Sequence, residues 1–395
     1  MWSSDIPVLR PGDVVAVRLE PGPTWRGLVE LVWGAGAALF PLDHRLPAAE
    51  ADALLALARP TVLVDARQGR RLEGGVEAPE GDAVLVATSG TSGSSRIVRL
   101  SRSAIDAAAA SSALALEADP HDEWLCCLPL GHIGGLLVLL RSVLLGAPVA
   151  VHARFDPTAV AALPNVRFVS VVPTMLARML DHGDDVARYR AILVGGSPMP
   201  AEMRDRARAA GARVVATYGL TESCGGVVYD GVALPGVGVR IGPRGGVQLS
   251  GPTLMRGYRF DDAATTAALT PDGWLKTRDA GDLGPDGRLR VLGRMDDVIL
   301  TGGEKVWPEE VENVLRIHPS VSDALVAGRD DEGWGQRVVA WIELAPGATA
   351  PDLEAIRDFV GNRLPRFRAP RELHVVVELP RTPLGKIRRS AIEPD

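Results

Sequence analysis

Lysine and cysteine are scarce in this chain of 395 residues, with three of each. The 43 basic residues are otherwise arginines, so Lys276, Lys305 and Lys386 can each be weighed separately. The cysteines form no C-x-x-C pair, which argues against a zinc site or a redox motif. Cys126 and Cys127 are adjacent in an apolar run, and we expect them to be small buried hydrophobic residues.

Long apolar runs and an excess of basic residues are also missing. No stretch of about 18 uncharged apolar residues occurs, so we expect no membrane span. The start of the chain lacks the basic and apolar regions of a signal peptide, which favours a cytoplasmic protein. The formal net charge of -6 gives no reason to expect nucleic acid as a partner.

What is present is the composition of a globular protein, with 46% hydrophobic and 23% charged residues. A chain of 395 residues exceeds one ordinary core, so we expect two domains. The sequence does not set the oligomeric state, and a homodimer is a hypothesis without support from the residues.

Up to about residue 217, short β-branched runs alternate with Ala/Leu-rich stretches. We expect strands at 61–65, 83–87, 168–172, 192–194 and 214–216, and helices at 48–58, 101–116, 136–145, 174–181 and 201–210. This alternation indicates an α/β fold with largely parallel, helix-covered sheets. Ligands of such sheets bind beyond the carboxyl ends of the strands.

Beyond residue 230 the pattern changes to glycine turns and short β runs, which indicates a β-rich subdomain. Asp-Gly pairs at 272–273 and 286–287 are hairpin-type turn signals. A small α+β unit follows, with helices at 308–317 and 353–364 and strands at 322–327, 338–344 and 372–378. We place the domain boundary at Asp296, which gives domains 1–295 and 296–395.

The run 87–96 packs six hydroxyls and two glycines into ten residues, directly after the expected strand 83–87. Backbone N–H groups, hydroxyls and a terminal cation in such a loop can hold phosphate oxygens. The Walker A spacing is absent, because no Lys-Ser/Thr pair follows. Taken alone, the run is either a phosphate loop of another kind or a solvated linker.

Further motifs follow in order. They are LPLGHIGG at 128–135, GGSP at 195–198, TYGLTE at 217–222, GWLKTRD at 273–279 with GRMDD at 293–297, and PRTPLGK at 380–386. Glu222 beside the Thr221 hydroxyl can hold Mg²⁺, or can be a surface or capping acid. His132 precedes an apolar helix, where it is a functional residue or a capping or core histidine.

Together these six motifs resemble the adenylate-forming superfamily of acyl-CoA synthetases, adenylation domains and luciferases, from about residue 24 to 395. Within it, residues 217–234 and 369–380 most resemble the short o-succinylbenzoate–CoA ligases of menaquinone synthesis. The resemblance implies a large AMP-binding N-terminal domain and a small mobile C-terminal domain. It also implies ATP, Mg²⁺ and CoA, with a carboxylic acid that forms an acyl-AMP and then an acyl-CoA.

The resemblance implies roles for residues of the large domain. The β- and γ-phosphates would be wrapped by Thr88, Ser89, Gly90, Thr91, Ser92 and Gly93, followed by Arg96. Glu222 would hold Mg²⁺, with Thr221 near the α-phosphate. The nucleotide would also contact Ser197, Pro198, Tyr218, Gly219, Asp279 and Arg294, and the acyl group His132, Gly196 and Gly219.

The resemblance also implies roles near the C-terminus. Lys386 would be the mobile catalytic lysine and Asp296 the hinge of the C-terminal domain. The pantetheine tunnel of CoA would be lined by Gly302, Gly303, Glu304 and Lys305, with His132 at its inner end. His132 would take part in catalysis there or only shape the pocket.

Two residues depart from the family pattern. Arg96 stands where the family has lysine, and its larger forked group changes how the loop can close. Arg278 stands where the family has glycine, and it would meet CoA phosphates or face solvent. Asp279 and Arg294 could also form only a solvated ion pair. The alternatives to an o-succinylbenzoate ligase are a ligase for another aryl or short-chain acid and a catalytically impaired nucleotide-binding homologue.

Overall fold

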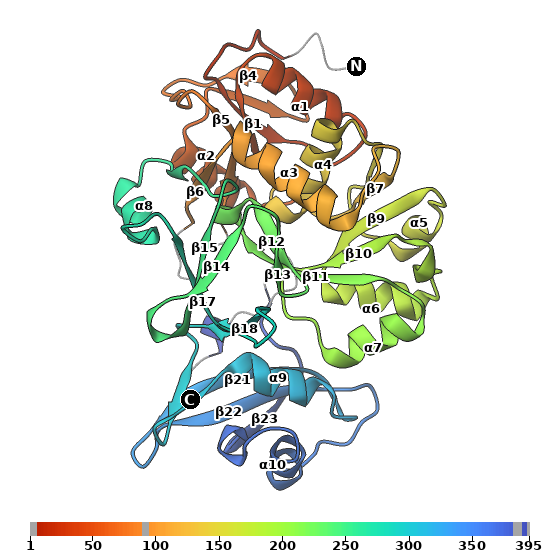
Figure 1. Ribbon diagram of the computed structural model, residues 1–395, viewed down its shortest axis with the longest axis vertical. Helices are drawn as coiled ribbons and strands as arrows, with labels where there is room; N and C mark the ends of the chain where they lie inside the picture. Colours follow the sequence, from red (N-terminus) through yellow and green to blue (C-terminus); the bar gives the residue numbers. More distant parts are fainter. Residues whose placement is uncertain (1–5, 89–94, 382–388, 393–395) are drawn as a thin grey trace. The chain divides into compact units, whose positions relative to one another are not determined.

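The computed structural model describes residues 6–88, 95–381 and 389–392, which form two compact units (Figure 1). The first unit spans 1–239, 248–276 and 287–289 within the described ranges, and the second spans 240–247, 277–286 and 290–395. The boundary at Asp296 stays a prediction. Among the described residues, no helix is long and apolar enough to cross a membrane.

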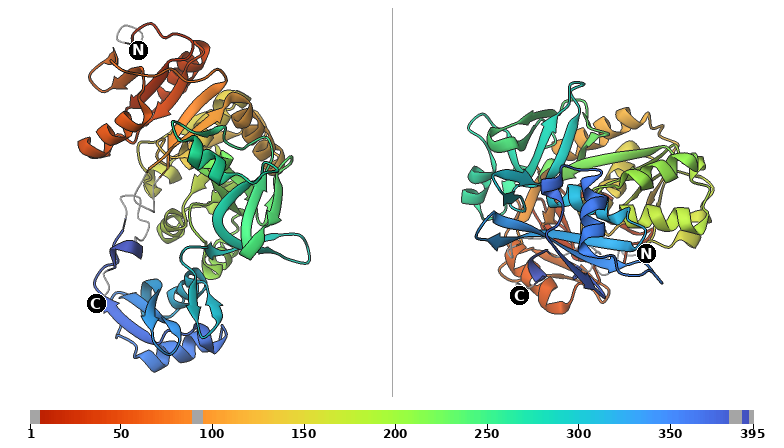
Figure 2. Two further views of the ribbon diagram at one scale, coloured as in Figure 1. Left: turned by 90° about the vertical axis from the view of Figure 1, so that its left-hand side faces the viewer. Right: turned by 90° about the horizontal axis from the view of Figure 1, so that it is seen from below.

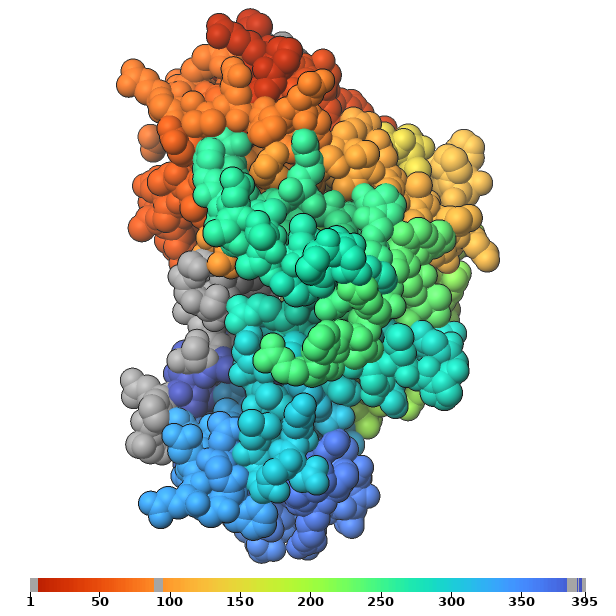
Figure 3. All heavy atoms as spheres, turned by 60° about the vertical axis from the view of Figure 1, so that its left-hand side comes forward, coloured from red at the N-terminus to blue at the C-terminus, as the bar shows by residue number. Residues whose placement is uncertain are grey.

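The first sheet of the first unit has seven strands in the order β16-β6-β5-β2-β1-β3-β4. Their bounds are β1 Val14–Arg18, β2 Ala38–Pro41, β3 Val62–Asp65, β4 Gly69–Arg71, β5 Asp82–Ala87, β6 Ile97–Ser101 and β16 Gly257–Tyr258. The four strands β1, β2, β3 and β5 are parallel, and β4, β6 and β16 are antiparallel to their neighbours. In Figure 3 the green-to-teal segment around β16 lies against the orange segment of β5 and β6.

The second sheet has seven strands in the order β13-β12-β11-β10-β9-β7-β8. Their bounds are β7 Glu123–Cys126, β8 Val149–Val151, β9 Val166–Val171, β10 Ala191–Val194, β11 Val214–Leu220, β12 Gly225–Tyr229 and β13 Val232–Ala233. The strands from β8 to β11 are parallel, and β12 and β13 complete an antiparallel edge. The expectation of largely parallel sheets is confirmed for the centre of each sheet, whereas antiparallel edges were not predicted.

Helices cover both sheets. Their bounds are α1 Trp25–Gly34, α2 Ala48–Ala58, α3 Arg102–Leu116, α4 Ile133–Leu145, α5 Pro157–Ala161, α6 Pro173–His182, α7 Ala201–Ala209 and α8 Asp262–Ala268. The helices α3 and α4 pack on each other and contact strands of both sheets. The helices α5, α6 and α7 cover the other face of the second sheet through Val160, Leu176, Met179 and Ala207. Strand β1 is buried from Val14 to Val17, as expected of a strand covered on both faces.

A four-stranded sheet follows, in the order β14-β15-β17-β18. Its strands are β14 Gly238–Ile241, β15 Gly246–Ser250, β17 Leu275–Leu283 and β18 Leu289–Arg294. The predicted turn at 286–287 joins β17 to β18, and the turn at 272–273 lies inside the bridge between Leu269 and Leu275. Both turn predictions are therefore confirmed.

The C-terminal part is an α+β unit, as predicted. Its elements are β19 Ile299–Thr301, β20 Glu304–Val306, α9 Pro308–Arg316, β21 Val321–Asp331, β22 Gly335–Leu344, α10 Leu353–Gly361 and β23 Glu372–Val376. The helices α9 and α10 pack on one face of the sheet, where Val311, Leu315, Ile356 and Val360 are buried (Figure 2). The other face buries Leu325, Val339, Trp341 and Leu379.

The cysteines test the expectation that Cys126 and Cys127 are buried. Cys126, Cys127 and Cys224 are all free and buried. Burial raises the pKa of the Cys224 thiol to about 12, so the thiol stays protonated at neutral pH. The interpretation of these residues as small hydrophobic side chains is confirmed.

Candidate active site

The strand β11 carries two of the residues assigned to the nucleotide or acyl site, Tyr218 and Gly219. We expected the strand to end at residue 216, before the TYGLTE motif, and this is wrong because Thr217 to Leu220 continue β11. The strand is longer than expected because it has an antiparallel partner, β12. Tyr218 pairs with Val228, and the register shifts between Tyr218 and Gly219. A Cβ atom on Gly219 would overlap the carbonyl oxygen of Gly225, so this close approach requires glycine.

The short 3₁₀ turn η2 (Thr221–Ser223) presents Glu222 after this strand. The N–H of Leu220 donates to the Ser223 hydroxyl at 2.8 Å, and that hydroxyl lies 3.0 Å from the Gly225 carbonyl oxygen. The N–H of Met255 donates to the backbone carbonyl of Glu222 at 2.8 Å. The backbone that carries the Glu222 carboxylate is therefore held from two sides.

One oxygen of the Glu222 carboxylate is held by Tyr258. The phenol hydroxyl donates to Glu222 Oε1 at 2.8 Å, and Tyr258 is 9% exposed. Among the residues that the structure describes, Oε2 of Glu222 has no hydrogen-bond partner. Burial raises the pKa of Tyr258, with the neighbouring Glu222 charge as a further cause. The phenol is therefore a donor at neutral pH and cannot compete with the carboxylate for a cation.

The Glu222 carboxylate and the Thr221 hydroxyl are oxygen ligands of the kind that Mg²⁺ binds. This ion takes oxygen ligands, and it often uses one or two carboxylates together with substrate phosphates and water. In the described part of the chain no group of three or more His, Cys, Asp or Glu side chains could hold a metal ion. A single carboxylate beside the Thr221 hydroxyl suits a cation that arrives with a nucleotide.

The predicted phosphate loop joins β5 to β6, and the structure describes its two ends. The N–H of Thr88 donates to the Arg96 carbonyl at 2.8 Å, and the N–H of Arg96 donates to the Thr88 hydroxyl at 3.1 Å. The Arg96 guanidinium lies 3.3 Å from Asp261 Oδ2 and 5.4 Å from the Tyr258 ring centroid. The other loop residues of the prediction, Ser89, Gly90, Thr91, Ser92 and Gly93, lie outside the described residues.

The residues assigned to the nucleotide and the acyl group lie on or directly after two neighbouring parallel strands. Gly196, Ser197 and Pro198 come after β10 and are exposed, while Tyr218 and Gly219 belong to β11. Strand β10 pairs with β11, and the Thr217 hydroxyl donates to the Val194 carbonyl at 3.3 Å. The two groups are therefore neighbours at the carboxyl end of the sheet, where ligands are expected.

His132 occupies the N-cap position of α4, but its side chain makes no capping hydrogen bond. Burial lowers the pKa of His132, so the imidazole is neutral at pH 7. A Cβ atom on Gly225 would lie 3.6 Å from Ile133 Cγ1, so the start of α4 lies beside the turn that follows Glu222. The structure thus places the start of α4, and His132 with it, near the turn that carries Glu222.

Asp279 and Arg294 form an ion pair in the second unit. Arg294 NH1 lies 3.0 Å from Asp279 Oδ1, with exposed side-chain fractions of 29% and 9%. The N–H of Asp279 also donates to the Thr277 hydroxyl at 3.2 Å. Because the carboxylate is buried, the alternative of a fully solvated ion pair does not describe it.

Arg278 has a partner that we did not anticipate. Its guanidinium donates to Asp296 Oδ2, with the Nε atom at 2.7 Å. Both side chains are about half exposed, at 49% and 55%. The extra cation next to Asp279 therefore pairs with the residue that we expected to be the hinge.

The residues assigned to CoA belong to the hairpin of β19 and β20, with Gly302 and Gly303 in the turn and Glu304 and Lys305 at the start of β20. Gly302 and Gly303 both have positive φ, which a tight two-residue hairpin turn requires. The N–H of Gly302 donates to the Trp334 carbonyl at 2.9 Å, and the Gly302 Cα faces the Trp334 ring. Gly302, Gly303, Glu304 and Lys305 are all exposed.

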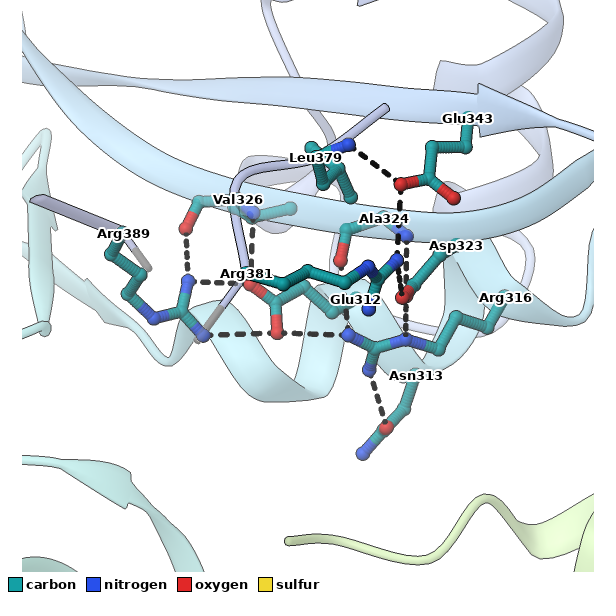
Figure 4. Close-up of polar contacts among 10 residues, drawn as sticks. All are labelled: Glu312, Asn313, Arg316, Asp323, Ala324, Val326, Glu343, Leu379, Arg381 and Arg389. Carbon is teal, nitrogen blue, oxygen red and sulfur yellow. Dashed lines mark hydrogen bonds and ion pairs between the residues drawn. The ribbon is translucent and has the colours of Figure 1, made fainter. Parts of the chain in front are cut away.

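Lys386 lies outside the described residues, but arginines on both sides of its segment are described (Figure 4). Arg381 donates to Asp323 at 2.7 Å and to Glu343 at 3.0 Å. Arg389 donates to Glu312 Oε2 at 2.9 Å and to the Val326 carbonyl at 2.6 Å. Both guanidinium groups anchor their parts of the chain on α9, β21 and β22.

The predicted site residues therefore divide between the two units. Thr88, Arg96, His132, Gly196, Ser197, Pro198, Tyr218, Gly219, Thr221 and Glu222 belong to the first unit. Asp279, Arg294, Asp296, Gly302, Gly303, Glu304 and Lys305 belong to the second. Tyr258 and Asp261 were missed in the sequence analysis. Gly257, directly before the tyrosine, marks a special backbone position, because its φ is 137° in the structure.

Known families match both parts of the chain. Residues 73–259 match the AMP-binding enzyme family, and residues 310–386 match the AMP-binding enzyme C-terminal domain. The chain is 40% identical over 382 residues to a probable 2-succinylbenzoate–CoA ligase of Mycobacterium tuberculosis, which covers 91% of this chain and 95% of that protein. It is 34% identical over 336 residues to 2-succinylbenzoate–CoA ligase of Bacillus subtilis, with coverages of 79% and 68%.

Solved structures are similar as well. The o-succinylbenzoate CoA synthetase (MenE) of Bacillus subtilis, in complex with the acyl-adenylate OSB-AMP, has a TM-score of 0.87 at 30% identity, covering 98% of this chain and 89% of its own. The same enzyme in complex with ATP and a magnesium ion has a TM-score of 0.86 at 29% identity, with coverages of 97% and 90%. ATP-bound MatB of Rhodopseudomonas palustris shares the fold, with a TM-score of 0.86 at 24% identity and coverages of 97% and 88%.

Proposed function

The chain belongs to the AMP-binding enzyme family and is an AMP-forming acid–thiol ligase, and we propose that its acid is 2-succinylbenzoate. The resemblance to the adenylate-forming superfamily is thereby confirmed. The single observation that carries the proposed substrate is the 40% identity to a protein of that name over 95% of its length. Menaquinone synthesis is the pathway that this substrate implies.

In the proposed first step, a carboxylate oxygen of the acid attacks the α-phosphorus of ATP and pyrophosphate leaves. Both reactants are anions, so positioning and neutralisation of charge supply most of the catalysis. Glu222, with one oxygen held by Tyr258, is our candidate ligand for the magnesium ion that accompanies ATP. Arg96 and the loop after Thr88 are our candidates for the β- and γ-phosphates, and Lys386 for the α-phosphate and the reacting carboxylate.

In the proposed second step, the CoA thiol loses its proton to solvent, its sulfur attacks the acyl carbon, and AMP leaves with the electrons of the broken C–O bond. The segment from Gly302 to Lys305, which is the hairpin turn and the start of β20, is our candidate for the pantetheine contact. Asp296 is our candidate for the hinge between the two steps. We assign His132 to the acyl pocket, where its neutral imidazole can donate or accept one hydrogen bond. We assign the ribose hydroxyls to Asp279, since an ionised carboxylate can accept hydrogen bonds from both.

Two further assignments are part of the proposal. The cytoplasm is the proposed compartment, where three free cysteines such as these remain reduced. A homodimer stays a hypothesis, which light scattering on the purified protein tests.

The experiment that tests the substrate is a screen of carboxylic acids for acid-dependent AMP release in the presence of ATP, Mg²⁺ and CoA. We expect 2-succinylbenzoate to give the highest kcat/KM and a product with the mass of its CoA thioester. Turnover of another aryl or short-chain acid without turnover of 2-succinylbenzoate would replace the substrate and keep the reaction class. No turnover with any acid, despite ATP binding, would favour the impaired homologue.

A further inference from the structure

Tyr258 connects the end of the predicted phosphate loop to the predicted magnesium ligand. On one side its hydroxyl donates to Glu222 Oε1 at 2.8 Å. On the other side its ring lies 5.4 Å from the Arg96 guanidinium, which is held by Asp261 at 3.3 Å. The four side chains come from η2, the end of the loop before β6, β16 and the N-cap of α8, all within the first unit.

The position of Tyr258 is fixed by the surrounding backbone. Strand β16 pairs antiparallel with β6, and the N–H of Tyr258 donates to the Thr265 hydroxyl at 2.8 Å. The residue is 9% exposed, so its ring has little freedom to move. A phenol has one proton to donate, and here it is used on the carboxylate.

The hydrogen bond from Tyr258 makes the two carboxylate oxygens of Glu222 different from each other. The hydrogen bond fixes the orientation of a flexible side chain, while Oε2 has no partner among the residues that the structure describes. Groups that orient a metal-binding carboxylate commonly change metal affinity by about 10- to 100-fold when they are removed. A carboxylate with one oxygen held and one available is prepared for a cation that binds on one side.

We propose that Tyr258 is a positioning residue for the magnesium site, holding Glu222 so that its second oxygen meets the cation that arrives with ATP. Arg96, tethered by Asp261, packs against the ring and keeps it in this orientation. The inference rests on the proposed function only in taking Glu222 as the ligand of that cation. It assigns to Tyr258 a role that acts through Glu222 and not through contact with the substrate.

The test is Tyr258→Phe, which keeps the ring against Arg96 and removes only the hydroxyl. Mn²⁺ serves as the probe, because it takes the same oxygen ligands as Mg²⁺ and is visible by electron paramagnetic resonance. We expect Mn²⁺ to bind about tenfold more weakly to the Phe variant saturated with a non-hydrolysable ATP analogue than to the unchanged protein. This measurement needs neither the acid nor CoA.

Tyr229→Phe is the matched control. The Tyr229 hydroxyl is also buried in the first unit and makes a side-chain hydrogen bond at 2.7 Å, but its partner is Ser112. We expect this variant to bind Mn²⁺ as the unchanged protein does. In a Glu222→Gln background, adding Tyr258→Phe should cause no further loss, because the carboxylate through which it acts is gone.

Each outcome decides the inference. Equal Mn²⁺ affinity in the Tyr258→Phe variant and the unchanged protein overturns it, as does an equal loss in the Tyr229→Phe control. A further tenfold loss in the Glu222→Gln background would place the action of the hydroxyl elsewhere. Failure of the proposed substrate is seen separately, in the acid screen, while Mn²⁺ binding with the ATP analogue would be retained.

Discussion

The guanidinium of Arg389 holds the carboxylate of Glu312, a residue of α9 that is 3% exposed (Figure 4). The same guanidinium lies 3.2 Å from Asp297, the residue after the proposed hinge. Arg316 is the other cation near Glu312, at 3.5 Å. Arg389 therefore neutralises the buried charge of Glu312 and also contacts Asp297, in the segment that follows β18.

Arg389→Ala is predicted to destabilise the C-terminal part of the chain. Removing one partner of a buried ion pair costs about 3–5 kcal/mol, and we expect a loss at the lower end of this range because Arg316 still lies 3.5 Å from Glu312. Denaturant unfolding of the full chain, with hydrogen exchange at the amides of β21, measures this loss. The control is Arg290→Ala, which removes an exposed pair with Asp282 in the same unit and should change stability little. Equal effects of the two variants would contradict the structural role of Arg389.

Lys386→Ala is predicted to separate the two half-reactions. The charge that stabilises the first transition state is lost, which should slow acyl-AMP formation by about a hundredfold or more. Formation of the thioester from supplied acyl-AMP should be largely unchanged. Single-turnover assays of each step measure this, with Lys276→Ala, an exposed lysine of β17, as the control. An equal loss in both steps would remove Lys386 from the assigned role.

Asp296→Pro is predicted to have the opposite pattern. Proline fixes φ at the proposed hinge, so the second step should slow by about a hundredfold while acyl-AMP formation continues. The change also removes the ion pair with Arg278, and Arg278→Ala removes that pair alone. We expect the Arg278 variant to carry out both steps at nearly the normal rate. Normal acyl-CoA formation by the Pro variant would show that residue 296 is not the hinge.

Folding stability is predicted to fall below neutral pH because of His132. Burial lowers the pKa of its imidazole in the folded protein, whereas the pKa of a histidine in the unfolded chain is about 6.5. Around and below that pH the unfolded state binds more protons than the folded state, so the contribution of His132 to the free energy of unfolding is lost as the pH decreases. Urea unfolding from pH 8 to pH 5 should show a smaller loss for His132→Asn than for the unchanged protein. His318 is a second histidine whose pKa is lowered by burial, so the His318→Asn variant measures how much of the pH-dependent loss of stability comes from that residue. If His132→Asn keeps the full pH dependence, His132 does not cause it.

The centre of the fold could be predicted from local pattern, whereas its edges could not. Helix α2 has the expected bounds, and β5 ends where the predicted strand 83–87 ends. Strands β6, β12 and β16 were not expected. They belong to the antiparallel margins of the two sheets, outside the parallel centres that the alternation of strands and helices indicates. The helix predicted from residue 101 begins at Arg102, with Ser101 as the N-cap.

The candidate site was predictable only where a motif is contiguous. Glu222 and Arg96 stand in recognisable motifs, but Tyr258 lies 36 residues from Glu222 and in no motif that we identified. The partner of Arg278 was missed for the same reason, since Asp296 is 18 residues away. Side chains that support a functional residue from another element leave no periodic or local signal in one sequence.

The most direct measurement is isotope exchange between pyrophosphate and ATP, with Mg²⁺ and 2-succinylbenzoate present and CoA absent. We predict exchange that depends on the acid, because the first step forms an acyl-AMP and pyrophosphate reversibly. Subsequent addition of CoA should convert the bound adenylate to the thioester and release AMP. Exchange without acid, or none with 2-succinylbenzoate although ATP binds, would contradict the proposed reaction of this protein.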